Sequence, residues 1–299
     1  MRRLLPALPL LAAAACAPFH AGPLPGAPAD DAYIDVEHTH LRYRDVGRGP
    51  TVVFLHGLGA TLETWERVTP ALHPGHRTIA LDLKGFGWSS RPAGDYSPRA
   101  QARIVLAFLD ELGVTDFCIV AHSWGSAVAL EVALLQGQRV QRVALLEAWV
   151  YDDQVPGFVR WSRRPALGAA LASLYDRSEL DLRLEQAYAD PDAVGQPLVD
   201  DVEARLRRPG ARAATAAIYR DFRPPKIRDG AYQHIVAPTL VVSCREDALT
   251  PPRPLRRLAD ELPNATFASM EGCGHFPMHE RLHATNRLLT DFLTEESTE

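Results

Sequence analysis

Lysine is almost absent from this chain: only Lys84 and Lys226 occur among its 32 basic residues. The formal net charge is -5 and no long basic run occurs, so the chain lacks the electrostatic footprint of a nucleic-acid-binding protein. The apolar run at residues 4–15 is shorter than the roughly 20 apolar residues that a transmembrane helix needs. We therefore expect no nucleic-acid partner.

The rest of the composition is that of an ordinary globular protein. Hydrophobic residues make up 46% of the 299 residues and charged residues 23%, which supplies enough apolar surface for a sizeable core. This balance excludes wholesale disorder, a collagen-like chain and a small disulfide scaffold. The length fits either two domains or one large α/β domain with an insertion.

The N-terminal sixteen residues have the pattern of an export signal. Two arginines precede the apolar run, and Ala13, Ala14 and Ala15 stand directly before Cys16. These alanines resemble the lipobox of bacterial lipoproteins, in which the cysteine is acylated and becomes the new N-terminus. We therefore predict a lipoprotein-type signal peptide over residues 1–16 and an exported protein, periplasmic or tethered to the outer membrane of a bacterium. Ordinary signal cleavage and a cytoplasmic leader are the alternatives.

Three further cysteines follow the signal region: Cys118, Cys244 and Cys273. An odd number of thiols cannot all pair. Cys244 and Cys273 end apolar runs close to the loops that carry candidate catalytic residues, which allows a disulfide between them. Three buried thiols are the alternative.

Apolar runs typical of buried parallel strands alternate along the chain with stretches of helical periodicity. The expected strands are residues 51–55, 78–83, 117–121, 142–146, 239–243 and 265–269, after an antiparallel hairpin of residues 33–37 and 41–46. The expected helices run from the Ser97 cap to Gly113, from Ser123 to Gly137, and from about residue 279 to residue 293. This alternation predicts an α/β fold with a mostly parallel, doubly wound sheet.

The strand pattern disappears between residues 150 and 232, where helical fragments are separated by prolines. We therefore predict a core of residues 31–149 and 233–299, with a helical cap inserted at residues 150–232 that forms a roof over the substrate. Residues 17–30 are rich in Pro, Gly and Ala and are expected to form an extended tether.

The candidate nucleophile is Ser123. The expected strand of residues 117–121 runs into Ser123 and then into a helix, which is the strand, tight turn and helix context of a nucleophile elbow. Small residues two positions before and after the serine, here Ala121 and Gly125, let the backbone turn sharply and lift the hydroxyl into a pocket.

With this elbow the chain resembles the α/β-hydrolase fold superfamily over nearly everything from residue 33 to residue 293. Further motifs stand in the family's order. His-Gly-Leu-Gly at residues 56–59 follows the third strand, and a glycine turn follows Asp82 at the end of the fourth. The strand before Asp247 looks like the one that delivers the family's acid, and the loop around His275 looks like the family's histidine loop. The resemblance implies an α/β-hydrolase sheet with an inserted cap.

The resemblance also implies a catalytic triad of Ser123, His275 and Asp247. His275 would accept the serine proton as the hydroxyl attacks a carbonyl, and Asp247 would hold the imidazole in the correct tautomer. The backbone N–H groups of Leu58 and Trp124 would form the oxyanion hole.

Other residues leave alternatives open. Glu147 ends the sixth strand, where dehalogenase-like members of the superfamily keep their acid, so it is the alternative to Asp247. His38 and His40 could pair on one strand face as metal ligands, but nothing near them completes a site, so neither a metal nor a cofactor is expected. We interpret His122, beside the nucleophile, as structural.

We therefore predict a serine hydrolase that cleaves an ester or related acyl bond of a small-molecule substrate through an acyl-enzyme. An aspartate nucleophile would have indicated a haloalkane dehalogenase or an epoxide hydrolase, and Ser123 argues against both. A prolyl-aminopeptidase-like peptidase, a carbon–carbon bond hydrolase and a haloperoxidase-like enzyme are the alternatives. A surface-tethered binding protein with the same fold is the non-enzyme alternative, against which the complete triad argues.

Overall fold

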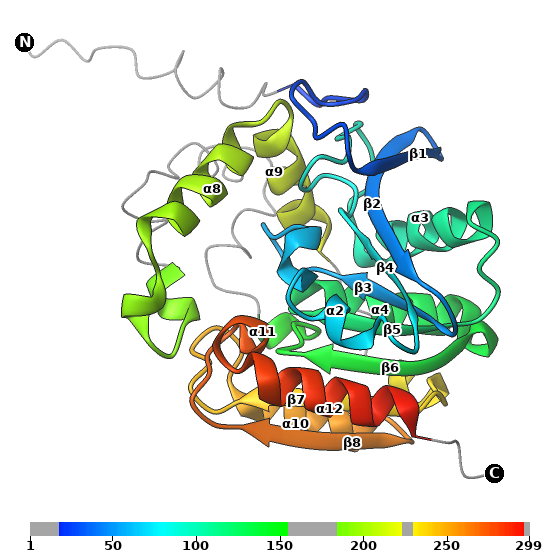
Figure 1. Cartoon of the computed structure of the whole chain (residues 1–299), viewed down its shortest axis with the longest axis vertical. Coiled ribbons are helices and arrows are strands. Elements are labelled where there is room, and N and C mark those ends of the chain that lie inside the picture. The colour runs from blue at the N-terminus through cyan, green and yellow to red at the C-terminus, as the bar shows by residue number, and fades with distance from the viewer. Residues whose placement is uncertain (1–17, 155–183, 223–229, 296–299) are drawn as a thin grey trace, which may run out of the picture.

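An eight-stranded sheet forms the centre of the computed structural model, which describes residues 18–154, 184–222 and 230–295 (Figure 1). The strands are β1 (Ala32–Val36), β2 (Thr39–Gly47), β3 (Thr51–Leu55), β4 (Arg77–Leu81), β5 (Phe117–His122), β6 (Val140–Leu146), β7 (Thr239–Cys244) and β8 (Ala265–Met270). Their order in the sheet is β1-β2-β4-β3-β5-β6-β7-β8. The pairs β1–β2 and β2–β4 are antiparallel and the others are parallel. The predicted α/β fold with a mostly parallel, doubly wound sheet is therefore confirmed.

The central strands are buried on both faces, which explains why they read as continuous apolar runs. Every residue of β3, β5 and β7 is buried. Along β3, Val53 and Leu55 pack into one apolar cluster, and Val52 and Phe54 pack into another. Neighbouring side chains of a strand point to opposite faces, so the sheet separates two cores.

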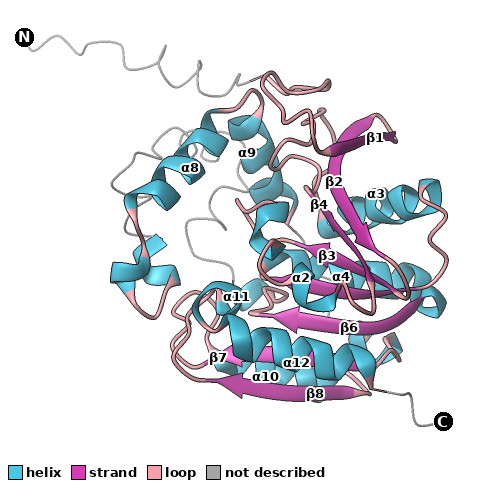
Figure 2. Cartoon of the chain, in the orientation of Figure 1, coloured by secondary structure: helices cyan, strands magenta, loops and turns pink. Residues whose placement is uncertain are grey.

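Helices cover both faces of the sheet (Figure 2). The helices on the face of Val53 and Leu55 are α3 (Pro98–Glu111), α4 (Trp124–Gln136) and α10 (Pro252–Glu261). The elements on the other face are η1 (Leu62–Trp65), α2 (Thr69–Leu72), α11 (Pro277–Glu280) and α12 (Leu282–Thr294). Short turns η2 (Gly137–Arg139) and η3 (Asp152–Gln154) flank β6.

Local capping decides where the helices begin and end. The Ser97 Oγ accepts a hydrogen bond from the Ala100 backbone N–H at 3.2 Å, as its capping role predicts, and Gly113 follows the helix with a φ of 66°. The C-terminal helix expected from about residue 279 to residue 293 is found as α12, but it begins later, at Leu282. Arg281, with φ −128° and ψ 44°, leaves the helical region and divides this segment into α11 and α12.

The predicted cap at residues 150–232 is described in part. Its described elements are η3, η4 (Pro191–Ala193), α8 (Gln196–Arg207), α9 (Ala211–Asp221) and the start of η6 (Ala231–His234). Residues 155–183 and 223–229 of the cap lie outside the described residues. Helices α8 and α9 stand on the side of the molecule toward which the arrowheads of β6 and β8 point (Figure 1). This is the carboxyl edge of the sheet, where α/β proteins hold their ligands.

The segment expected to be a tether contacts the core from Phe19 onward. The backbones of His20 and Arg91 exchange two hydrogen bonds, at 2.8 and 2.6 Å, and the Phe19 ring stacks on Tyr96. Leu24 is buried, with 4% of its surface exposed. An extended tether over all of residues 17–30 is therefore corrected, because apolar side chains within it find partners in the folded core.

The predicted signal peptide at residues 1–16 lies outside the described residues. In the ranges that are described, no helix is both long and apolar enough to cross a membrane.

Candidate active site

Ser123 lies at the sharp turn between β5 and α4. Its φ of 51° and ψ of −124° are rare for a residue with a side chain. A Cβ added to Gly125 would meet the His56 carbonyl oxygen at 2.4 Å and the Leu55 carbonyl oxygen at 2.8 Å. Only glycine fits there, so α4 can start directly against the end of β3.

Three predicted side chains form one hydrogen-bonded chain in the structure. The His275 Nε2 lies 2.8 Å from the Ser123 Oγ, and the His275 Nδ1 lies 2.7 Å from the Asp247 Oδ2. Ser123, His275 and Asp247 are 4%, 6% and 3% exposed, so water screens these contacts little. The residues come from positions 123, 247 and 275 of the chain and meet at the carboxyl edge of the sheet.

Asp247 is held ionised by its surroundings. Its Oδ1 accepts hydrogen bonds from the backbone N–H groups of Leu249 at 2.7 Å and Thr250 at 3.1 Å, and its Oδ2 also contacts the Thr250 hydroxyl. Burial alone would raise the pKa of Asp247. The attraction of His275 and the hydrogen bonds to the carboxylate outweigh burial and lower this pKa well below its usual range.

Glu147, the alternative acid, lies behind Asp247 and is fully buried. Its Oε1 accepts the Cys244 backbone N–H at 2.5 Å, its Oε2 lies 3.3 Å from the Thr250 hydroxyl, and its carboxyl group shares a hydrogen bond with Asp247. Burial and the charge of Asp247 raise the pKa of Glu147 to about 11. Glu147 therefore keeps its proton at neutral pH and can donate it in a hydrogen bond to Asp247.

The two segments with the predicted oxyanion donors flank Ser123. Trp124 is the first residue of α4, so its backbone N–H has no acceptor within the helix. Leu58 follows Gly57, and a Cβ added to Gly57 would lie 2.9 Å from the Ser123 Cβ. The loop that carries Leu58 therefore runs directly against Ser123.

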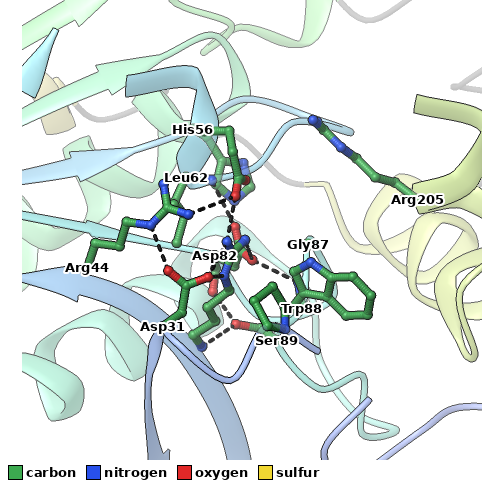
Figure 3. A network of polar contacts seen from close by, with 12 residues as sticks. Asp31, Arg44, His56, Leu62, Asp82, Gly87, Trp88, Ser89 and Arg205 are labelled. Atoms are coloured by element: carbon green, nitrogen blue, oxygen red, sulfur yellow. Dashed lines mark hydrogen bonds and ion pairs between the residues drawn. The ribbon is translucent and has the colours of Figure 1, made fainter. Parts of the chain in front are cut away.

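A buried polar network around Asp82 holds that loop in place (Figure 3). The Asp82 carboxylate accepts the backbone N–H groups of Leu62 at 2.8 Å and Trp88 at 2.7 Å. It also pairs with Arg42 at 3.2 Å. The His56 Nε2 accepts the backbone N–H that follows Asp82 at 3.1 Å. These contacts tie the loop after β3 to the loop after β4.

The loop of His275 is held from three sides. The His122 Nε2 donates to the His275 carbonyl oxygen at 2.6 Å, and burial lowers the pKa of His122 well below its ordinary value, so this ring is neutral. The His275 backbone N–H donates to the carbonyl oxygen of Ala187 in the cap at 2.6 Å. The Glu280 carboxylate accepts backbone N–H groups from both Gly274 and Ala189, each at 2.7 Å. The cap therefore packs directly on the histidine loop.

A disulfide joins Cys244 and Cys273, the pairing that the sequence left open. Their Cα atoms are 5.4 Å apart, and both residues are fully buried. Cys118 is a free, buried thiol, and burial raises its pKa to about 11.

Across the described ranges, no group of three or more histidine, cysteine or acidic side chains could hold a metal ion. The His40 Nδ1 lies 2.8 Å from the Asp35 carboxylate, and His38 occupies the turn beside it with a φ of 64°. The His279 Nδ1 lies 2.9 Å from the Tyr188 hydroxyl, and burial lowers the pKa of His279 to about 4.

Comparison with known proteins agrees with this architecture. A family model described as alpha/beta hydrolase fold matches residues 50–282. This chain belongs to the alpha/beta hydrolase fold family. The solved structure of a thermophilic esterase from Thermogutta terrifontis matches with a TM-score of 0.76 over 89% of this chain and 98% of that one. Its sequence identity of 22% limits this likeness to the fold.

Two relatives extend over most of this alpha/beta hydrolase-fold chain. A 2-hydroxymuconate semialdehyde hydrolase from Pseudomonas putida is 31% identical over 274 residues, covering 84% of this chain and 89% of that protein. A haloalkane dehalogenase from Mesorhizobium japonicum is 27% identical over 285 residues, covering 88% of this chain and 90% of that protein. The family is therefore one of enzymes with different chemistries on one fold.

Several residues around the site of this hydrolase-fold protein were missed by the sequence analysis. Thr250 contacts Asp247, Glu280 ties the cap to the histidine loop, and Ala187 accepts the His275 backbone N–H. None of these positions belongs to a motif. Thr250 and Glu280 could have been found only because they lie near Asp247 and His275 in the sequence. No sequence signal pointed to Ala187.

Proposed function

We propose that this protein is a serine hydrolase that cleaves an ester or related acyl bond. The observation that carries the proposal is the continuous chain from the Ser123 Oγ through His275 to Asp247, with contacts of 2.8 and 2.7 Å. A serine hydroxyl is a weak nucleophile, and this arrangement is the one that activates it.

In the first step the Ser123 Oγ attacks the substrate's carbonyl carbon. The hydroxyl proton passes to the His275 Nε2, and the carbonyl π electrons move to the oxygen. The backbone N–H groups of Leu58 and Trp124 would stabilise that oxyanion, at about 3 kcal/mol for each donor. Asp247 keeps its negative charge and stabilises the imidazolium.

In the second step the tetrahedral intermediate collapses and the bond to the leaving group breaks. The proton on the His275 Nε2 moves to the leaving group, which departs as an alcohol and leaves an acyl-enzyme on Ser123. Water then attacks the acyl carbon and gives its proton to His275. The bond between the acyl carbon and the Ser123 Oγ then breaks, and the proton passes from His275 to the Ser123 Oγ, which releases a carboxylic acid and restores the Ser123 hydroxyl.

A second candidate is hydrolysis of a carbon–carbon bond. It is favoured by the 31% identity to a 2-hydroxymuconate semialdehyde hydrolase over 84% of this chain. The likeness to a haloalkane dehalogenase does not carry over in the same way, because Ser123 would form an ether and not an ester when it displaces a halide. A substrate panel of p-nitrophenyl esters and 2-hydroxymuconate semialdehyde separates the two candidates through their relative kcat/KM.

The decisive experiment asks whether Ser123 is activated. A fluorophosphonate probe should label the wild type at Ser123, and Ser123→Ala should abolish both labelling and turnover of p-nitrophenyl acetate, a loss on the order of 10⁴-fold or more. Ser126→Ala is the matched control. It removes a nearby serine hydroxyl whose hydrogen-bond partner, at 3.5 Å, is the Ala121 carbonyl oxygen and not His275. Wild-type turnover in a folded Ser123→Ala protein would refute the proposal.

We also propose that the protein is exported and tethered through a lipidated Cys16. The leader that carries this proposal lies outside the described residues, so its support is the pattern of residues 1–16. The disulfide between Cys244 and Cys273 adds support, because disulfides persist in oxidising compartments.

A further inference from the structure

The disulfide lies between the two loops that bring the acid and the histidine together. Cys244 is the last residue of β7 and precedes the acid loop, residues 245–250. Cys273 belongs to the histidine loop, residues 271–276, just ahead of His275. Both cysteines are fully buried. The loops that they join carry Asp247 and His275, whose side chains are 2.7 Å apart.

Polar contacts at the surface also join these loops. Arg245 pairs with Glu271 at 2.6 Å, and the Gly272 backbone N–H donates to Glu246 at 3.0 Å. The Arg245 and Glu271 side chains are 62% and 70% exposed. Exposed ion pairs contribute little to holding a geometry, because water and salt screen them and both side chains must be ordered. The disulfide is fully buried, as are the contacts that Asp247 and Thr250 make with His275.

The backbone of Cys244 is also connected to the acid itself. Its N–H donates to the Glu147 carboxyl group at 2.5 Å, and that carboxyl group shares a hydrogen bond with Asp247. A shift of Cys244 would therefore reach Asp247 through Glu147. On the other side, a shift of Cys273 would move His275 through the short stretch of backbone between them.

We propose that the Cys244–Cys273 disulfide is a positioning element of the active site, which fixes the separation of the acid loop and the histidine loop and so aligns the hydrogen bond from His275 to Asp247. This inference rests on the proposed serine hydrolase function. Its physical basis is that loops are mobile and that reacting groups must be held within a fraction of an ångström for full rate.

The test is a Cys244→Ala/Cys273→Ala double variant, assayed well below its unfolding temperature. We expect kcat for p-nitrophenyl acetate to fall on the order of 10- to 100-fold, with KM within about twofold, because the substrate-binding surfaces are retained while the catalytic groups are misaligned. Cys118→Ala is the matched control, because it removes a buried cysteine distant in sequence from both loops and should leave kcat unchanged.

A second readout reports the alignment without turnover. The proton between the His275 Nδ1 and Asp247 should give a downfield proton NMR signal in the wild type, assigned by its loss in His275→Ala. That signal should broaden or vanish in the double variant while its far-UV circular dichroism stays native. A wild-type kcat together with a retained signal would overturn the inference and leave the disulfide with a purely stabilising role.

If the double variant does not fold, dithiothreitol treatment of the folded wild type supplies the same comparison. The dithiol gives up two electrons and two protons and closes to a cyclic disulfide, while the S–S bond of the protein becomes two thiols. Thiol counting follows the reduction, and the NMR signal and kcat are then measured on the folded, reduced protein. Absence of Ser123-dependent turnover in the untreated wild type would refute the proposed function alone, because the NMR signal reports the loop positions independently.

Discussion

Replacing Glu147 with glutamine keeps the shape of a buried side chain and removes the carboxyl group that can gain or lose a proton. In the folded protein Glu147 accepts a hydrogen bond from the Cys244 backbone N–H and shares another with Asp247. Burial and the charge of Asp247 raise its pKa from 4.5 to about 11. A glutamine amide can make the same two hydrogen bonds, because its oxygen accepts and its nitrogen donates.

The size of the effect follows from the linkage between proton binding and stability. Between pH 4.5 and about 11, the folded protein binds a proton at Glu147 that the unfolded chain has lost. The free energy of unfolding therefore falls by about 1.4 kcal/mol for each unit of rising pH. Glutamine binds no proton in either state and lacks this slope. When the pH rises from about 6 to about 8, the free energy of unfolding of Glu147→Gln should therefore increase by about 3 kcal/mol relative to that of the wild type.

Urea unfolding of both proteins at the two pH values measures this difference. Glu63→Gln is the matched control. Burial opposes the ionisation of Glu63, but its hydrogen bond with Arg42 outweighs burial and lowers the pKa to about 2, so Glu63 stays ionised in both states over this range. The difference in the free energy of unfolding between Glu63→Gln and the wild type should therefore not change with pH. An identical pH dependence for the wild type and Glu147→Gln would refute the conclusion that the folded protein keeps Glu147 protonated.

The same protonation state predicts the activity of two amide variants. At neutral pH, Glu147→Gln should keep kcat within about threefold of the wild type, whereas Asp247→Asn should lower it on the order of 10⁴-fold, because only the partner of His275 sets the tautomer. The reverse ranking would assign the acid role to Glu147.

Two further changes test the elbow and the N-terminus. A Gly125→Ala side chain would meet the carbonyl oxygens of His56 and Leu55 at 2.4 and 2.8 Å, so we expect a loss of about 3 kcal/mol or more in stability by thermal unfolding. Gly137→Ala is the control, because nothing lies within 4 Å of its added Cβ, and it should unfold at the same temperature as the wild type. Equal unfolding temperatures for the two variants would contradict the clash at Gly125.

A palmitate analogue should label the wild type in a bacterial host but not Cys16→Ser, and an unlabelled wild type would indicate ordinary signal cleavage.

Local patterns in the sequence were sufficient to predict the strands and the elbow. A parallel strand covered by helices must be apolar on both faces, so β3, β5 and β7 stand out as continuous apolar runs. The turn at Ser123 needs small neighbours, and Ala121 and Gly125 are visible as such in the sequence. Parallel strands also bring their carboxyl ends to one edge, so the order of the motifs indicates which loops meet.

Which of the two acids contacts His275 was decided by the tertiary structure. The sequence motifs favoured Asp247, but Glu147 also follows a strand at the same edge of the sheet and remained the alternative. In the folded protein Asp247 faces the His275 Nδ1 at 2.7 Å, while Glu147 turns to the Cys244 backbone N–H.

Contacts between distant segments were decided by the tertiary structure alone. A disulfide needs Cα atoms within roughly 4.4–6.8 Å, and the spacing of Cys244 and Cys273 along the chain does not reveal their 5.4 Å separation. Composition alone predicted a tether at residues 17–30, yet Phe19 packs on Tyr96. Local sequence determines backbone preference and which faces are apolar, whereas the partner that covers an apolar or polar group is set only when the whole chain has folded.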